Sequence, residues 1–209
     1  TIENSYKISE TIGRHCVAEG RIFFSSDQTF QHSFYEYVPD SQSSIKLCTT
    51  NKYYDVSKLE ATTDKLYFLG KNNDFVDLEY NLASVEDSFT YSGERISSID
   101  LQTGEIKDLP IDLPVSFSKA PDNNLIIYAY DEEKGYYFII YNTKSNKFSD
   151  KIYHNLGYLT SFDVYNKNYD IVFLNIKRSG HPTLTAASIY PDQRTLKKHS
   201  NTSAHYAII

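Results

Sequence analysis

The sequence predicts an all-β fold built from repeated four-stranded antiparallel units. Three observations lead to this prediction. Apolar residues come in short runs or in strict alternation, turn residues (Gly, Asn, Asp, Pro, Ser) separate the runs, and the 15% aromatic content consists entirely of 19 Tyr and 12 Phe. Short runs bounded by turn residues are typical of strands, which Tyr and Phe favour. Only residues 78–86 have a pattern that fits a helical turn or two.

Four dense apolar runs each follow directly on a short turn. They begin at Ile22, Leu66, Leu125 and Ile171, with spacings of 44, 59 and 46 residues. In "SFSKAPDNNLIIYAY", residues 116–130, a strand-like run reaches a Pro-Asp-Asn-Asn turn just before the apolar run. Each junction therefore predicts a hairpin made by the first two strands of a unit.

A second pair of strands, joined by a polar turn, follows each of these hairpins. Asp, Asn, Gly and Ser in such turns supply local hydrogen bonds or tolerate positive φ. The four turns are Pro39-Asp40-Ser41, Gln102-Thr103-Gly104, Lys144-Ser145-Asn146 and Pro191-Asp192-Gln193. Four antiparallel strands in about 45 residues form the blade of a β-propeller. The predicted fold class is therefore an all-β β-propeller with about four blades present, compatible with part of a larger ring.

Two motifs resemble those of known propeller superfamilies. "FSKAPDNN" (residues 117–124) resembles the Phe-Ser-x-Asp-Gly turn between the first two strands of WD40 and TolB-like blades, and "IDLQTGEI" (99–106) resembles their Asp-x-x-Thr-Gly turn. The resemblance covers about residues 5–209. The chain has no Trp and lacks the Gly-His pair of true WD40 blades. A TolB-like or prolyl-oligopeptidase-type propeller is therefore the better match, and the resemblance implies a fold rather than a function.

We expect one β-propeller domain, or a segment of one, over residues 1–209. The predicted blades cover about 13–57, 58–114, 115–158 and 159–200, and a further blade starts at 203–209. "SYKISETIG" predicts an outer strand before the first blade, whereas "SAHYAII" predicts the inner strand of a fifth blade that lacks its two middle strands. Open blade edges are an aggregation hazard. We therefore expect an excerpt of a larger propeller, or a chain that pairs with another chain or segment to complete one.

Composition argues against several classes of partner. The formal net charge is −6, and the densest basic run is Lys197-Lys198 beside His199. This is too small for a nucleic-acid footprint, so neither a nucleic acid nor an anionic membrane surface is the expected partner. No apolar run approaches the roughly 18–20 residues that span a bilayer. The sequence leaves the compartment open, with an extracytoplasmic or secreted location slightly favoured.

The sequence shows no pattern of catalytic or metal-binding residues. It has no Gly-x-Ser-x-Gly motif, its six His residues form no ligand pair, and its 8 Gly residues are not clustered. The two cysteines, Cys16 and Cys48, fit buried or half-buried free thiols better than a zinc or redox pair. We therefore predict no catalytic residues, no cofactor and no metal site, apart from the calcium alternative considered next.

The second unit carries an insertion that explains the 59-residue spacing. Residues 72–93 contain five acidic residues and no basic one. Long loops on a rigid scaffold are where binding residues tend to lie. The loop is either a solvated acidic segment, a site for a basic protein partner or a weak calcium site, because carboxylates are the ligands that calcium prefers. Its acidic residues are Asp74, Asp77, Glu79, Glu86 and Asp87.

Charged residues also occupy the equivalent loops of the next two units. Asp131 and Glu132 lie in the third, and Lys177, Arg178 and His181 lie in the fourth. Because equivalent loops share one face of a propeller, acidic and basic tips would line a common rim. Such a rim suits a zwitterionic or peptide ligand, although three unrelated solvated turns would look the same.

Two functions fit these observations. The favoured one is a non-catalytic binding or scaffold module for a protein, peptide or glycan. The alternative is the gating propeller of a serine peptidase of the prolyl-oligopeptidase type, whose catalytic domain lies outside this chain; "YDIVFLNIKRSGHPTL" loosely resembles a blade of that group. A Gly-x-Ser-x-Gly segment in the parent polypeptide would favour the alternative.

Overall fold

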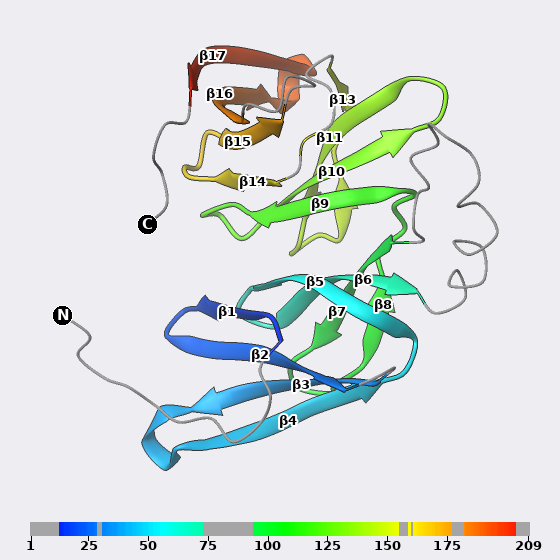
Figure 1. The fold of residues 1–209 in the computed structure, drawn as a ribbon, viewed down its shortest axis with the longest axis vertical. Coiled ribbons are helices and arrows are strands. Elements are labelled where there is room, and N and C mark those ends of the chain that lie inside the picture. The colour runs from blue at the N-terminus through cyan, green and yellow to red at the C-terminus, as the bar shows by residue number, and fades with distance from the viewer. Residues whose placement is uncertain are drawn as a thin grey trace. The chain divides into compact units, whose positions relative to one another are not determined.

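The computed structural model describes residues 13–28, 31–72, 94–154, 159, 161–176 and 182–203. The chain divides into two compact units, Thr1–Leu113 and Pro114–Ile209. Within these described ranges, each unit contains two antiparallel sheets whose strands follow one another in sequence order (Figure 1). The two units are described one at a time below.

The first unit contains two four-stranded sheets. The first sheet consists of β1 (His15–Ala18), β2 (Arg21–Gln28), β3 (Gln31–Val38) and β4 (Ser43–Thr50). The second sheet consists of β5 (Tyr53–Ala61), β6 (Lys65–Asn72), β7 (Glu94–Asp100) and β8 (Ile106–Asp108). β5 pairs with β6 from Tyr53 onward, so this sheet begins five residues before the blade boundary expected at residue 58.

The second unit repeats this arrangement. Its first sheet consists of β9 (Pro114–Lys119), β10 (Leu125–Asp131), β11 (Gly135–Asn142) and an outer strand in two pieces, β12 (Lys147–Phe148) and β13 (Ile152–Tyr153), which both pair with β11. Its second sheet consists of β14 (Ser161–Val164), β15 (Asp170–Ile176), β16 (Pro182–Tyr190) and β17 (Thr195–Ser203). The predicted all-β class and the four-stranded units are therefore confirmed.

The turns between the third and fourth strands of all four sheets share one backbone feature. Each contains a single residue with a left-handed backbone: Gln42, Gly104, Asn146 and Arg194, with φ between 48° and 72°. Two of these turns are 3₁₀ turns that begin with proline, η1 (Pro39–Ser41) and η3 (Pro191–Gln193). The four turns that the sequence placed in equivalent positions are therefore equivalent in conformation.

Aromatic side chains pack neighbouring sheets together within each unit. In the first unit, Phe34 of β3 lies 4.7 Å from Phe68 of β6, measured between ring centroids. In the second unit, Phe138 of β11 meets Phe162 of β14 edge to face at 5.4 Å. All four rings are buried. Since the chain has no Trp, Phe and Tyr provide the large apolar surfaces that such packing needs.

Three further expectations concern the cysteines, the membrane and the helix. Cys16 and Cys48 are both half-buried and neither forms a disulfide, which agrees with the sequence. Within the described ranges, no helix is long and apolar enough to cross a membrane. The helical turn expected at residues 78–86 and the end strands expected at 5–13 and 203–209 lie almost entirely outside the described residues.

Candidate functional site

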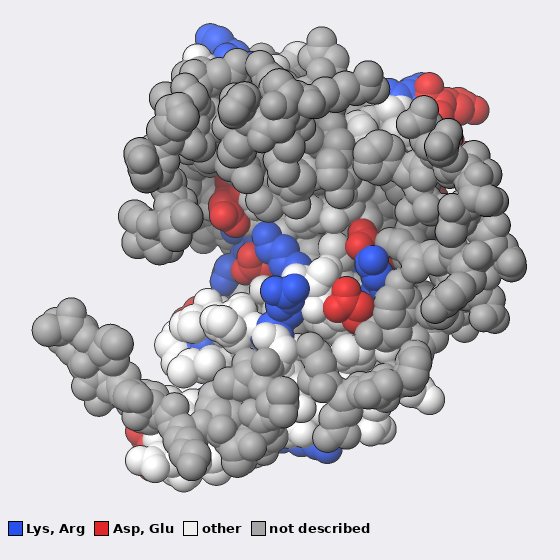
Figure 2. Space-filling model, in the orientation of Figure 1, with Lys and Arg blue, Asp and Glu red and all other residues white. Residues whose placement is uncertain are grey.

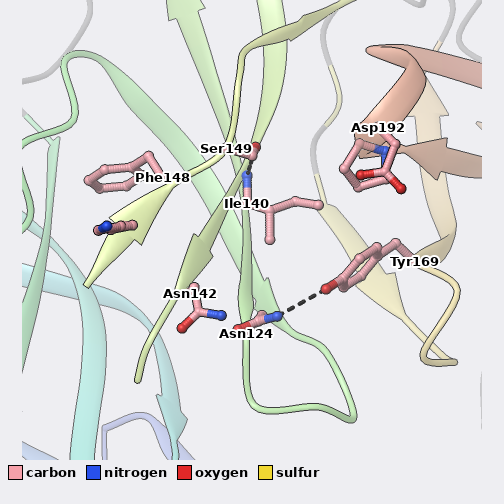
Figure 3. Close-up of a pocket in the computed structure, with 9 residues that line it drawn as sticks. Asn124, Ile140, Asn142, Phe148, Ser149, Tyr169 and Asp192 are labelled. Atoms are coloured by element: carbon pink, nitrogen blue, oxygen red, sulfur yellow. Dashed lines mark hydrogen bonds between the residues drawn. The ribbon is translucent and has the colours of Figure 1, made fainter. Parts of the chain in front are cut away.

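The candidate site is a pocket in the second unit, at one end of both of its sheets. Its cavity volume is about 370 Å³. One wall comes from the β9–β13 sheet, with Asn124, Ile140 and Asn142, and the other from the β14–β17 sheet, with Tyr169 and Asp192 (Figure 3). Turns that join first to second strands and third to fourth strands meet at the same end of an antiparallel sheet, and they bring these residues together.

Two tight turns position the polar residues of the walls. In the β9–β10 turn, the N–H of Ala120 donates to the carbonyl of Asn124 at 2.8 Å, and Asn123 adopts a left-handed backbone with φ 66°. In the β14–β15 turn, Tyr169 also adopts a left-handed backbone, with φ 56°. The side-chain oxygen of Asn166 accepts from the N–H of Asp170 and holds that turn. Asn tolerates this conformation well and Tyr does so rarely, so Tyr169 is held by its surroundings.

A triangle of hydrogen bonds joins the two walls, and we call Asp122, Asn124 and Tyr169 the clamp. The Tyr169 hydroxyl donates to Asp122 Oδ2 at 2.7 Å. Asn124 Nδ2 donates to the Tyr169 hydroxyl at 2.9 Å and to Asp122 Oδ2 at 2.8 Å. Burial raises the pKa of Tyr169 above its usual value, and the bond to the Asp122 carboxylate raises it further. Tyr169 therefore remains a neutral hydroxyl that fixes the width of the pocket.

The rest of the first wall is held by hydrogen bonds of its own. Ser149 Oγ accepts from the N–H of Ile140 at 3.0 Å and donates to the carbonyl of Asp150 at 2.9 Å. The ring of Phe148 lies against that of Tyr141, with centroids 4.8 Å apart. The wall is thus a formed surface that does not need a ligand to hold its shape.

Two charged side chains of opposite sign lie on the rim. Lys147 comes from β12 and Asp192 from the η3 turn, and both are exposed. Neither makes an ion pair within the part of the chain that the structure describes. Both charges are therefore available to a ligand.

The residues predicted from the sequence lie at the opposite end of the sheet or outside the described ranges. Asp131 ends β10, and its Oδ2 accepts from Lys151 Nζ at 2.8 Å and from the Tyr153 hydroxyl at 2.9 Å. These two bonds hold the pKa of Asp131 well below its ordinary value, and the bond from Lys151 has the larger effect. Asp131 thus attaches β13 to the β10–β11 hairpin.

The remaining predicted residues are placed as follows. Glu132 is exposed at the tip of the β10–β11 hairpin. The others lie outside the described residues: Asp74, Asp77, Glu79, Glu86, Asp87, Lys177, Arg178 and His181. The binding roles of all the predicted residues, Asp131 and Glu132 included, remain predictions. In the described ranges, no three His, Cys, Asp or Glu side chains gather closely enough to hold a metal ion.

Ser188, His199 and Asp170 come together in the last sheet, but not in the order of a hydrolase triad. The Ser188 hydroxyl donates to Asp170 Oδ1, and Ser188 Oγ lies 2.6 Å from His199 Nε2. In a serine hydrolase the histidine lies between the other two and takes the serine proton. Here the serine lies in the middle and is buried, so the carboxylate cannot orient the imidazole. The three residues form a structural link across β15, β16 and β17.

Comparisons with known proteins show similarity at the level of structure. A scan of protein-family models and a search of curated proteins give no match. Among solved structures, TolB from Acinetobacter baumannii matches with a TM-score of 0.58 and 10% identity, over 87% of this chain and 41% of its own. A chain of a nidogen/laminin complex matches with a TM-score of 0.56 and 13% identity, over 88% and 60%. An oligogalacturonate lyase in complex with manganese matches with a TM-score of 0.59 and 14% identity, over 90% and 52%.

These three structures are β-propellers, and the likeness shows that this chain has the same fold. The chain spans between 41% and 60% of their lengths. The predicted TolB-like resemblance is therefore confirmed as a resemblance of fold. The sequence predicts the Asp-Asn-Asn and Pro-Asp-Gln turns, which contribute residues to the pocket, but it predicts them only as turns. Asn124 and Tyr169 lie in equivalent turns, between the first two strands of adjacent blades, and this equivalence was the signal that could have identified a shared site.

Proposed function

We propose that these β-propeller blades form a non-catalytic module that binds a protein, peptide or glycan in the pocket of the second unit. The observation that carries the proposal is a formed cavity of about 370 Å³ whose walls are fixed by their own hydrogen bonds. Small-ligand pockets are typically about 300–1,000 Å³ and largely preformed. The similar solved structures include a nidogen/laminin complex and an oligogalacturonate lyase, so both protein and glycan ligands are represented among proteins of this fold.

The chemistry of the pocket supports binding rather than catalysis. Its lining offers amides, a neutral tyrosine hydroxyl, an aromatic ring and two rim charges. The described part of the lining contains no histidine beside a nucleophile, which acyl transfer would require. Figure 2 shows both acidic and basic side chains among the described residues, and charges of both signs fit a protein or peptide partner better than a nucleic acid.

The test is to fill the pocket and measure ligand binding. Lys147 lines the pocket on a short outer strand, so Lys147→Trp places a large ring in the cavity without disturbing the core. Lys144→Trp is the matched control, because Lys144 is also exposed and lies in the preceding turn but does not line the pocket. The full chain is screened against a displayed peptide library and a glycan array. We expect ligands that bind the parent and Lys144→Trp but not Lys147→Trp; ligands insensitive to Lys147→Trp, or no ligand at all, would contradict the proposal.

A further inference from the structure

We infer that the pocket takes an extended peptide segment and recognises its main chain through a complementary pair of amides, Asn142 and Asn124. This inference rests on the proposed binding function and specifies its ligand. Both side chains line the pocket, and each uses one of its polar atoms in hydrogen bonds within the protein and leaves the other without a hydrogen bond to the described residues. The pair thus offers one donor and one acceptor, which is what a residue in an extended peptide presents along one edge.

The orientation of the Asn142 amide is fixed by the turn that follows it. Asn142 Oδ1 accepts from the backbone N–H of Lys144 at 3.2 Å and of Ser145 at 2.8 Å. A side-chain nitrogen in that place could not accept these bonds, so the assignment of oxygen and nitrogen follows from the network. The NH₂ group of Asn142 therefore points away from the turn, and it has no hydrogen-bond partner within the described residues.

The Asn124 amide is fixed in the opposite sense by the clamp. Its Nδ2 donates to Asp122 Oδ2 and to the Tyr169 hydroxyl, and the carboxylate can only accept. Asn124 Oδ1 is left as an acceptor without a hydrogen bond in the described part of the chain. The two asparagines thus have fixed and opposite polarity toward the pocket.

The strand register places the two amides next to each other. Leu125 pairs with Tyr141 in the β10–β11 ladder, so Asn124 and Asn142 occupy the next position outward on the two strands. Residues opposite each other in such a pair have Cβ atoms about 4.5–5.5 Å apart and project to the same face. Figure 3 shows the two side chains side by side among the residues that line the pocket. Asn124 directly precedes β10 and Asn142 ends β11, and the hydrogen bonds of the two side chains hold this donor and acceptor in place.

The surroundings of the pair favour a peptide over a glycan. Lys147 and Asp192 provide opposite charges on the rim, which suits a segment that carries both an acidic and a basic group. Ile140 and Pro191 provide apolar contact for a side chain. A sugar-binding site typically uses an open aromatic face, whereas the two aromatic rings of the lining, Phe148 and Tyr169, are half-buried, and Phe148 packs against Tyr141.

The experiment begins with heptapeptides selected from a displayed random library on the full chain. Each is then synthesised in its natural form and in forms that are N-methylated at one amide at a time. Binding is measured by calorimetry, and the side-chain amide signals of Asn124 and Asn142 are followed by NMR. The chain is tested as the parent and as Asn142→Asp, which keeps an oxygen for the turn and removes the outward NH₂ donor. Asp100 caps the equivalent turn in the first unit with a carboxylate, so the substitution is compatible with this fold.

Asn168→Asp is the matched control, because it adds the same charge at an exposed residue that does not line the pocket. We expect Asn142→Asp to weaken peptide binding at least tenfold, Asn168→Asp to leave it unchanged, and N-methylation at one particular amide to weaken it at least tenfold. Peptides that shift the pocket signals but tolerate both changes would overturn the main-chain inference and leave the binding function standing. Binding of glycans but not of peptides would also overturn the main-chain inference and leave the binding function standing. If neither library yields a ligand, the proposed function fails as well.

Discussion

The clamp leads to the most direct prediction, because a single hydroxyl joins two sheets. Tyr169→Phe keeps the ring and removes the oxygen that donates to Asp122 at 2.7 Å and accepts from Asn124 at 2.9 Å. A hydrogen bond to a charged group contributes about 1.5–3 kcal/mol to stability. Asp122 Oδ2 retains its bond from Asn124, and the site is only half buried, so water replaces part of the loss. We expect the variant to be less stable by about 1–2 kcal/mol.

Urea unfolding of the full chain, monitored by far-UV circular dichroism, measures this loss. The comparison is valid when the free energy of unfolding falls with urea concentration at the same slope for parent and variant. Tyr165→Phe is the matched control, because Tyr165 lies in the same turn region, is 56% exposed and makes no hydrogen bond through its hydroxyl to any described residue. We expect that change to stay within about 0.5 kcal/mol. Hydrogen exchange should show the Tyr169→Phe loss mainly in the second unit.

A double-mutant cycle makes the reasoning refutable. Asp122→Ala removes the acceptor, so the Tyr169 hydroxyl has less to lose in that background. We expect a coupling energy of about 1 kcal/mol between the two changes. Strict additivity, or a Tyr169→Phe variant as stable as Tyr165→Phe, would show that the clamp does not hold the two sheets together.

Three further predictions concern single sites. A Cβ on Gly70 would lie 2.8 Å from Cδ1 of the buried Tyr53, so Gly70→Ala should cost about 1–3 kcal/mol in urea unfolding, and an equal cost in a Tyr53→Leu background would contradict this cause. Burial lowers the pKa of His154 to about 4, so the unfolded state alone takes up this proton between about pH 6.5 and 4. The free energy of unfolding should therefore fall by about 2 kcal/mol between pH 7 and 5 because of His154. In His154→Gln this contribution of about 2 kcal/mol should be absent. Burial raises the pKa of the Cys48 thiol to about 11, so iodoacetamide at pH 8 should label it slowly until urea unfolds the chain, and rapid labelling of the folded chain would argue against that environment.

The strands were predictable because their signals are local. The hairpin at residues 116–130 is encoded by an apolar run and a Pro-Asp-Asn-Asn turn that lie within a few residues of each other. The break of the outer strand into β12 and β13 was not predicted, and neither were the bonds that Lys151 and Tyr153, next to and within β13, make to Asp131 across the sheet. Patterns that involve one segment can be read from the sequence, whereas those that need a partner 20 residues away are much harder to recognise.

The pocket was missed because it depends on contacts that are one blade repeat apart. Asn124 and Tyr169 are separated by 45 residues, close to the period of the repeat. Equivalent turns in successive blades lie next to each other, so residues offset by one period are candidates for contact even when neither carries a motif. The sequence pointed instead to charged loop tips, and Asp131 shows why such a reading is incomplete, since its charge is used to hold the fold.

The comparison of Asn142 with Asp100 explains how a repeat can acquire a binding site at little structural cost. In both turns a side-chain oxygen accepts from two backbone N–H groups, and this oxygen is all that the turn requires. Asp and Asn meet that requirement equally well. The second polar atom then differs, a carboxylate oxygen at Asp100 and an NH₂ group at Asn142. Because the turn constrains only the first atom, the second can vary between blades and be used for binding. In this fold, the residues that specify a ligand are therefore best sought among the turn-forming residues themselves, at the atoms that the turn does not use.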